Sequence, residues 1–126
     1  MQPRPKYDLQ QRTQTFARDV RIFVRKLPVA IFEDDIKQLV RSSGSIAANY
    51  LEADEALSKK DFTYRIRICR KEAKESMCWL HFMQMQLSEV LEKERLRLRN
   101  ETREFVLIFN SIVQKMEKLD PKLRSS

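Results

Sequence analysis

The sequence predicts an all-α protein, an antiparallel four-helix bundle in up-down-up-down order. Its 126 residues include 1 Gly and 4 Pro, too few turn residues for a sheet protein, which needs them every 8–12 positions or so. Apolar residues recur at three- and four-residue spacing in four separate segments, the pattern of amphipathic helices. The links between the segments are short, and short links join antiparallel neighbours. Together these observations predict one bundle domain.

The first two helices are separated by a proline. Asp8 is a candidate N-cap for the first helix, and Pro28 ends it. The second helix is predicted to begin at residues 33–35, where acidic side chains suit the positive end of the helix dipole. Gly44 lies among small residues in its interior, which predicts the close approach of a neighbouring helix; a kink at Gly44 is the alternative. The two apolar stripes consist of Leu9, Thr13, Phe16, Val20, Phe23, Val24 and Leu27, and of Ile36, Leu39, Val40, Ser43, Ile46, Ala47, Tyr50 and Ala53.

The third helix is predicted to run from Lys59 to the mid-80s. Ser58 to Asp61 resembles a capping box, with Asp in place of the usual Glu. A break is expected within residues 84–92, because a single helix continuing to Lys118 would be about 90 Å long and could not fold back. Asp120-Pro121 ends the fourth helix, whose stripe contains Leu91, Leu98, Thr102, Phe105, Phe109, Ile112, Val113 and Met116. The expected organisation is a flexible arm at 1–6, the bundle at 7–118 and a tail at 119–126.

The third helix carries two stripes, roughly 80–140° apart on a helical projection. The core stripe consists of Phe62, Ile66, Cys69, Ala73, Leu80 and Leu87. A helix of a monomeric bundle needs one buried stripe, so the second stripe predicts contact with another copy of the chain. The residues predicted for this subunit interface are Arg65, Ile68, Glu72, Glu75, Trp79 and Phe82.

The residues that could carry catalysis or bind a cofactor are sparse. A glycine-rich nucleotide loop is excluded by the single Gly, and one His without a Cys-x-x-Cys pair argues against zinc. Glu72 and Glu75 could form a carboxylate site, but di-iron bundles use Glu-x-x-His, and Cys78 stands where that His would be. Pairing with an Arg, for which Arg65 is the candidate, explains these glutamates better. His81 lies three residues after Cys78, which is only a weak indication that the two residues pair as a nucleophile and its base. We therefore expect no metal, no cofactor and no enzymatic activity.

The charge favours an anionic partner. The formal net charge is +7 and the pI about 9.6, a balance typical of nucleic-acid-binding proteins. The alternative is a solvated basic face, with cations of the third helix pairing to the acidic second helix. No aromatic residue interrupts the basic rows, so contact would be with the phosphate backbone and tolerant of sequence. The predicted nucleic-acid-binding residues are Arg18, Arg21, Arg25, Arg67, Arg70, Lys71, Lys74, Arg95, Arg99 and Arg103.

Cellular location follows from what the sequence lacks. No apolar run approaches the roughly 18–20 residues that cross a bilayer. The N-terminal residues lack the apolar core of a signal peptide. A cytoplasmic protein without membrane contact is expected.

Two motifs resemble those of a known family. They are Arg41-Ser-Ser-Gly-Ser-Ile-Ala-Ala-Asn-Tyr50 followed by Glu52-Ala53, and Lys71-Glu-Ala-Lys-Glu-Ser76 followed by Trp79-Leu80. Both resemble the bacterial four-helix-bundle proteins called 23S ribosomal RNA intervening-sequence proteins, over residues 7–118. Cys78 departs from the family, which often carries an aromatic residue before the Trp, and the fourth helix is more basic than expected.

The resemblance implies a homo-oligomeric ring, a pentamer. The chain is also similar to the accessory variability determinant of diversity-generating retroelements, a basic pentamer that works with a reverse transcriptase and its RNA. We therefore expect a non-enzymatic homo-oligomer that binds RNA or DNA. The alternative is a protein-interaction scaffold or an accessory factor for a reverse transcriptase.

Overall fold

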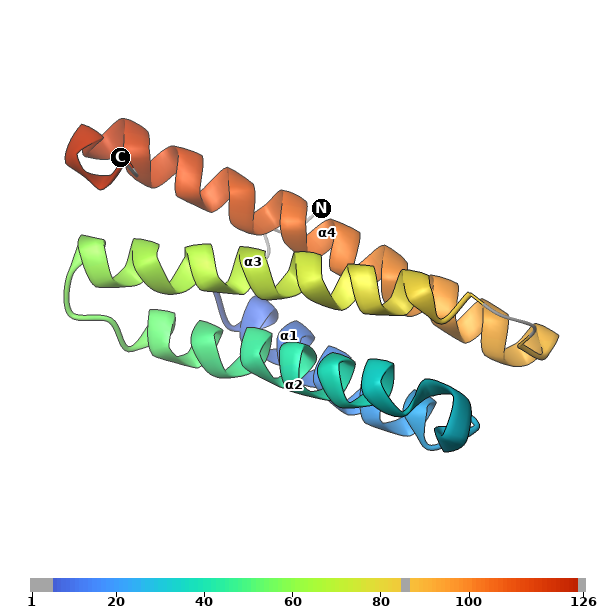
Figure 1. The fold of residues 1–126 in the computed structure, drawn as a ribbon. Coiled ribbons are helices and arrows are strands. Elements are labelled where there is room, and N and C mark those ends of the chain that lie inside the picture. Colours follow the sequence, from blue (N-terminus) through green and yellow to red (C-terminus); the bar gives the residue numbers. More distant parts are fainter. Residues whose placement is uncertain (1–5, 85–86, 125–126) are drawn as a thin grey trace.

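The computed structural model describes residues 6–84 and 87–124, with side chains from residue 9 onward. Four helices make up this part of the chain: α1 (Lys6–Val24), α2 (Val29–Asp54), α3 (Lys59–Phe82) and α4 (Glu89–Leu119), followed by a 3₁₀ turn, η1 (Pro121–Leu123). Consecutive helices run antiparallel (Figure 1). Helix α1 packs against α2 and α4, and α3 packs against the same two helices. The predicted all-α class is confirmed, and the described residues include no strand.

The first connection differs from the prediction. Helix α1 begins at Lys6, so Asp8 lies inside it and is not its N-cap; the rest of the predicted arm, residues 1–5, lies outside the described residues. Helix α1 ends at Val24, so the predictions that it includes Leu27 and ends at Pro28 are wrong. Helix α2 begins at Val29, four residues earlier than expected, with Pro28 as its N-cap. The Pro28 carbonyl accepts from the backbone N–H groups of Ile31 and Phe32, and Phe32 then kinks the helix with φ −112° and ψ 18°.

The other connections lie where the sequence places them. The Ser58 hydroxyl accepts from the Asp61 backbone N–H at 3.0 Å, which confirms the cap of α3. Ser88 caps α4 in the same way through Leu91, a cap that the sequence analysis missed. Helix α3 ends at Phe82, so Leu87 lies beyond it rather than on its core stripe, although it still packs partly buried against the core.

The C-terminal residues are more ordered than the predicted tail. Asp120 caps η1 by accepting from the Lys122 N–H at 3.1 Å. The side chain of Leu123 is buried, and its carbonyl accepts from the Arg67 guanidinium. The segment 119–124 therefore belongs to the bundle, while residues 125 and 126 lie outside the described part.

The core is apolar and follows the predicted stripes. Phe16 meets Phe105 edge-on with ring centroids 5.6 Å apart, and Phe105 stacks on Phe109 at 5.9 Å. One contact between α2 and α3 joins two fully buried serines, Ser42 and Ser76, whose hydroxyls lie 2.7 Å apart. Small residues therefore do bring α2 close to a neighbouring helix.

Gly44 itself has a different neighbour. A Cβ placed there would lie 3.0 Å from Nη2 of Arg21. The space beside this glycine is thus occupied by the end of a long α1 side chain. The prediction that a helix approaches at Gly44 is wrong in this detail.

The helices differ in length, and this shapes the two ends of the bundle. Helix α1 has 19 residues, whereas α4 has 31. Helix α1 lies beside the half of the bundle that carries the α1–α2 and α3–α4 connections (Figure 1). The opposite end, around the α2–α3 turn, consists of α2, α3, α4 and η1.

Candidate nucleic-acid interface

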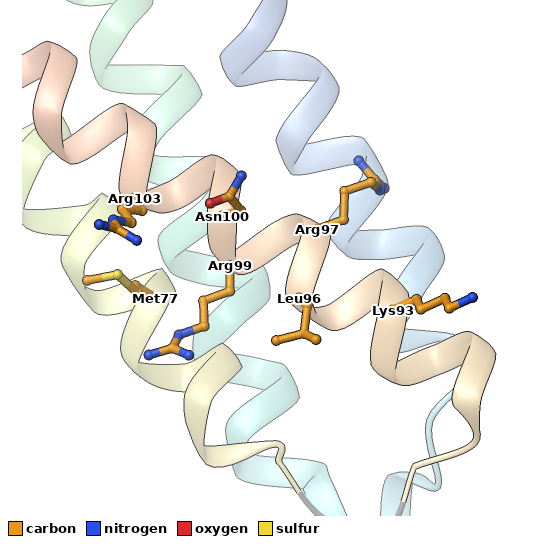
Figure 2. A pocket seen from close by; sticks show the side chains of 7 residues that line it. All are labelled: Met77, Lys93, Leu96, Arg97, Arg99, Asn100 and Arg103. Carbon is orange, nitrogen blue, oxygen red and sulfur yellow. The ribbon is translucent and has the colours of Figure 1, made fainter.

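A basic hollow opens between α3 and α4. It has a volume of about 540 Å³ and is lined by Met77, Lys93, Leu96, Arg97, Arg99, Asn100 and Arg103. Figure 2 shows the Arg99 and Arg103 side chains extending from α4 toward α3, beside Met77. No carboxylate is among the lining residues. The hollow therefore combines positive charge with the apolar surface of Met77 and Leu96.

The cations of this hollow differ in how far they are neutralised. Arg97 turns toward α1, where its Nη1 lies 3.4 Å from Asp19 Oδ2. Lys93 lies 4.0 Å from Glu89. Arg99 and Arg103 form no ion pair with any residue in the described ranges. These two guanidinium groups are therefore the ones that an anion in the hollow would meet.

A second hollow, of about 390 Å³, lies beside the first on the surface of α3. It is lined by Arg67, Arg70, Lys71, Lys74, Glu75 and Cys78. Arg67 is neutralised by Glu117 at 2.8 Å. Arg70 donates to the neutral amide of Asn110 at 3.0 Å, so its charge is not compensated. Lys71 and Lys74 are exposed.

Together the two hollows form one surface, which we call the α3–α4 basic face. It consists of the lining cations that form no ion pair with a carboxylate among the residues described, although the charge of Lys71 does lower the pKa of Glu75. These cations are Arg70, Lys71, Lys74, Arg99 and Arg103. Three- and four-residue spacing places each row along one side of its helix. Antiparallel packing of α3 on α4 then brings the two rows together.

Arg95 does not belong to this face, and its prediction as a nucleic-acid contact is wrong. Its side chain is 2% exposed. It donates to the Leu80 carbonyl at 3.0 Å and to the Glu92 carboxylate. Carbonyls in the last turn of a helix lack an intrahelical donor, so Arg95 supplies one to the end of α3. Its guanidinium is unavailable to an external phosphate.

The α1 cations form a separate surface. Arg18 and Arg25 are exposed on α1, which packs against α2 and α4 and not beside α3. Arg21, predicted in the same row, lies against α2 and donates to the carbonyls of Ala17 at 2.8 Å and Val40 at 3.4 Å. The predicted nucleic-acid residues thus do not lie on one continuous surface.

A charge cluster joins α2 to α3. Arg41 donates to Glu72 at 3.0 Å and to Glu75 at 2.7 Å; we call these three residues the α2–α3 charge cluster. The prediction that Arg65 pairs with these glutamates is wrong, since Arg65 donates to Asn49 at 3.1 Å. The pairing also runs opposite to the expected neutralisation of α3 by α2, because here α2 supplies the cation.

The two glutamates of this cluster have opposite pKa shifts. Burial raises the pKa of Glu72 above its ordinary value, and its hydrogen bond with Glu75 raises it further. That same hydrogen bond lowers the pKa of Glu75, as does Arg41. Glu72 is thus the carboxyl that takes up a proton first as the pH falls.

The remaining predicted interface residues lie on α3 near the cluster. Trp79 packs partly buried against the core, with its ring centroid 5.7 Å from that of Phe82. Phe82 is 52% exposed, and Ile68 is half-buried. Part of the second stripe is therefore used within the subunit, and contact with another copy stays a prediction.

The two cysteines differ in environment. Cys69 is fully buried, with Sγ 3.6 Å from the Ile46 carbonyl oxygen. Burial raises the pKa of its thiol to about 12, so the prediction that it is a buried apolar residue is confirmed. Cys78 is exposed. Among the described residues, no cluster of three or more His, Cys, Asp or Glu side chains could hold a metal ion.

The sequence model of a protein family, described as 23S rRNA-intervening sequence protein, matches residues 6–111. The chain belongs to this family. The matched range covers α1, α2, α3 and most of α4, including the whole α3–α4 basic face. The link to retroelement accessory proteins stays a prediction.

One solved structure similar to this member of the 23S rRNA-intervening sequence protein family comes from Bacteroides thetaiotaomicron. It is described as a protein of unknown function from the S23 ribosomal protein family. It is 27% identical, covers 86% of this chain and 97% of its own, and superimposes with a TM-score of 0.71. No curated protein matches the chain. None of the helices in the described ranges is long and apolar enough to span a membrane.

Proposed function

We propose that this protein is a non-enzymatic, homo-oligomeric nucleic-acid-binding protein, which contacts the phosphate backbone through the α3–α4 basic face. One observation supports this proposal above the others. Five cations gather on adjacent helices, and none of them forms an ion pair with a carboxylate in the described part of the chain. The positive charges of such a surface repel one another unless an anion neutralises them, and a polyanion neutralises several of them at once.

Binding would depend on charge more than on sequence. Arg and Lys side chains neutralise phosphates and release counterions, so affinity falls as salt rises. With five contacts in each subunit, the slope of log K against log salt should be about −3.5 for a single strand and about −4.5 for B-form DNA. Phosphate contacts position a protein without reading bases. We therefore expect binding that tolerates many sequences.

Assembly would multiply these contacts. The exposed ring of Phe82 and the half-buried Ile68 and Trp79 offer apolar surface on α3, and we propose a second copy of the chain as its partner. A closed ring, a pentamer by family resemblance, would repeat the basic face around its axis. Each added face raises the effective affinity for a long polyanion.

Anisotropy titration of a labelled RNA of about 20 nucleotides tests binding at about 50 and 200 mM salt. Replacing both Arg99 and Arg103 by Gln should weaken binding at least tenfold and lower the salt slope by about 1.4 to 1.8. The control is Arg97→Gln, because this neighbouring arginine already pairs with Asp19. Absence of binding at the lower salt, or equal affinity of all three proteins, would contradict the proposal.

Analytical ultracentrifugation tests the assembly. We expect a sedimenting species several times the 15.1 kDa mass of one chain. Phe82→Glu should shift it toward the single chain, because a buried charge opposes an apolar contact. A stable single chain at micromolar concentration would contradict the oligomer while leaving phosphate binding open to the titration above.

A further inference from the structure

We infer that the hollow between α3 and α4 takes a single-stranded polynucleotide in preference to a duplex. Phosphates would bind Arg99 and Arg103, and one nucleoside would lie on Met77 and Leu96. This inference rests on the proposed function and specifies the ligand of the same face.

The size of the hollow favours a single strand. Its volume is about 540 Å³, which lies within the range of pockets that hold a small molecule, so one nucleotide can enter it. A duplex, whose major groove alone is about 12 Å wide, is too broad to enter a hollow of this volume and would lie across its rim.

The lining of the hollow offers apolar surface to an unstacked base. Met77 is partly buried and Leu96 is 47% exposed, so both offer apolar surface to a ligand. Bases present their faces to a protein when they are unstacked, as in single strands, and duplexes bury those faces in the stack. The thioether of Met77 is polarizable and adapts to many ring shapes. No aromatic residue lines the hollow, so the contact with a base is limited to Met77 and Leu96 and adds less affinity than the phosphate contacts.

Two guanidinium groups of the hollow are spaced along α4 to suit successive phosphates. Arg99 and Arg103 lie one helical turn apart, about 6 Å along α4, and both extend to the same side (Figure 2). Successive phosphates of an extended strand can bind such a pair. Met77 lies beside them from α3, and Asn100 lines the same hollow with an exposed amide. The lining of the hollow thus combines cationic, apolar and hydrogen-bonding groups.

The test compares an unstructured single-stranded RNA with the duplex of the same sequence, at equal salt. We expect the single strand to bind at least tenfold more tightly. Leu96→Ser should weaken single-strand binding about three- to tenfold, by removing apolar contact, and leave duplex binding unchanged. The control is Ile22→Ser on α1, because Ile22 is 41% exposed and lies outside the hollow.

The outcomes separate this inference from the proposed function. Equal or tighter duplex binding overturns the inference while the proposed function stands. The inference is also overturned, and the proposed function stands, if replacing Arg99 and Arg103 abolishes binding while Leu96→Ser has no effect. The cations would then bind phosphates without any contact between the ligand and the apolar lining of the hollow. Absence of binding to either RNA overturns both.

Discussion

Replacing Arg95 by Met tests whether a buried guanidinium stabilises the α3–α4 connection. Met retains an apolar stem of similar length but removes the hydrogen bonds to Leu80 and Glu92. Loss of a charged hydrogen bond to a buried carbonyl costs about 1.5–3 kcal/mol. Against this loss, Met needs no dehydration of a cation, and the partly exposed Glu92 regains water. We expect the free energy of unfolding to fall by about 2 kcal/mol.

For a chain of 126 residues, 1 kcal/mol corresponds to about 4 °C, so the melting temperature should fall by about 8 °C. Arg95→Ala leaves a cavity as well and should cost about 4 kcal/mol. Urea denaturation followed by circular dichroism measures both. The control is Arg97→Met, whose side chain is 57% exposed and whose loss should cost under about 0.5 kcal/mol. If Arg95→Met is at least as stable as the wild type, dehydrating the buried cation costs at least as much as its hydrogen bonds contribute, and the prediction is refuted.

Three further predictions concern burial and backbone. Cys78 should react with a thiol reagent in the native protein, whereas Cys69, whose pKa burial raises to about 12, should react only on unfolding; two fast native thiols would contradict this. The raised pKa of Glu72 means that its stabilising effect is complete below the ordinary Glu pKa and is lost as the pH rises. At neutral pH, Glu72→Gln should therefore match or exceed the urea midpoint of the wild type, whereas at acidic pH, where Glu72 is protonated, it should bring no gain. A midpoint below that of the wild type at neutral pH would show that the charge cluster outweighs burial. Gly44→Ala should stabilise the protein by about 0.5 kcal/mol, because a gain in helix propensity of about 1 kcal/mol is partly offset by displacing the flexible end of Arg21; a measured loss would mean that this side chain cannot move.

The helices and the core could be predicted because they depend on local periodicity. Ile66, Cys69 and Ala73 recur at the spacing of one helical face, and all three are fully buried. The start of α2 could not be placed, since Pro28 is compatible with both the end of one helix and the first turn of the next. The acidic residues that follow pointed to a later start, but the backbone of a first turn can form before them.

The basic rows could be predicted, but their pairing could not. Spacing assigns a side chain to a face of its own helix, as it does for Lys71 and Lys74. It does not give the axial register of the neighbouring helix, which decides which acceptor is within reach. Arg95 donates to the Leu80 carbonyl in the last turn of α3. Arg41, and not Arg65 as predicted, pairs with Glu72. Each correction arises from a contact between two consecutive helices, whose axial register the spacing within either helix does not give.

The unequal helix lengths have a consequence for how the molecule opens. Amide hydrogens of α4 near Phe105 lie where α4 packs against α1, since the ring of Phe105 contacts that of Phe16. Those near Lys118 lie at the end with three long helices, where Leu57 is fully exposed. Although α4 is one continuous helix, its amide hydrogens should exchange with solvent slowly at its centre and progressively faster toward its C-terminal turns. Arg67 donates hydrogen bonds to Glu117 and to the Leu123 carbonyl. It would therefore determine how much faster the amide hydrogens of the C-terminal turns exchange than those at the centre of α4.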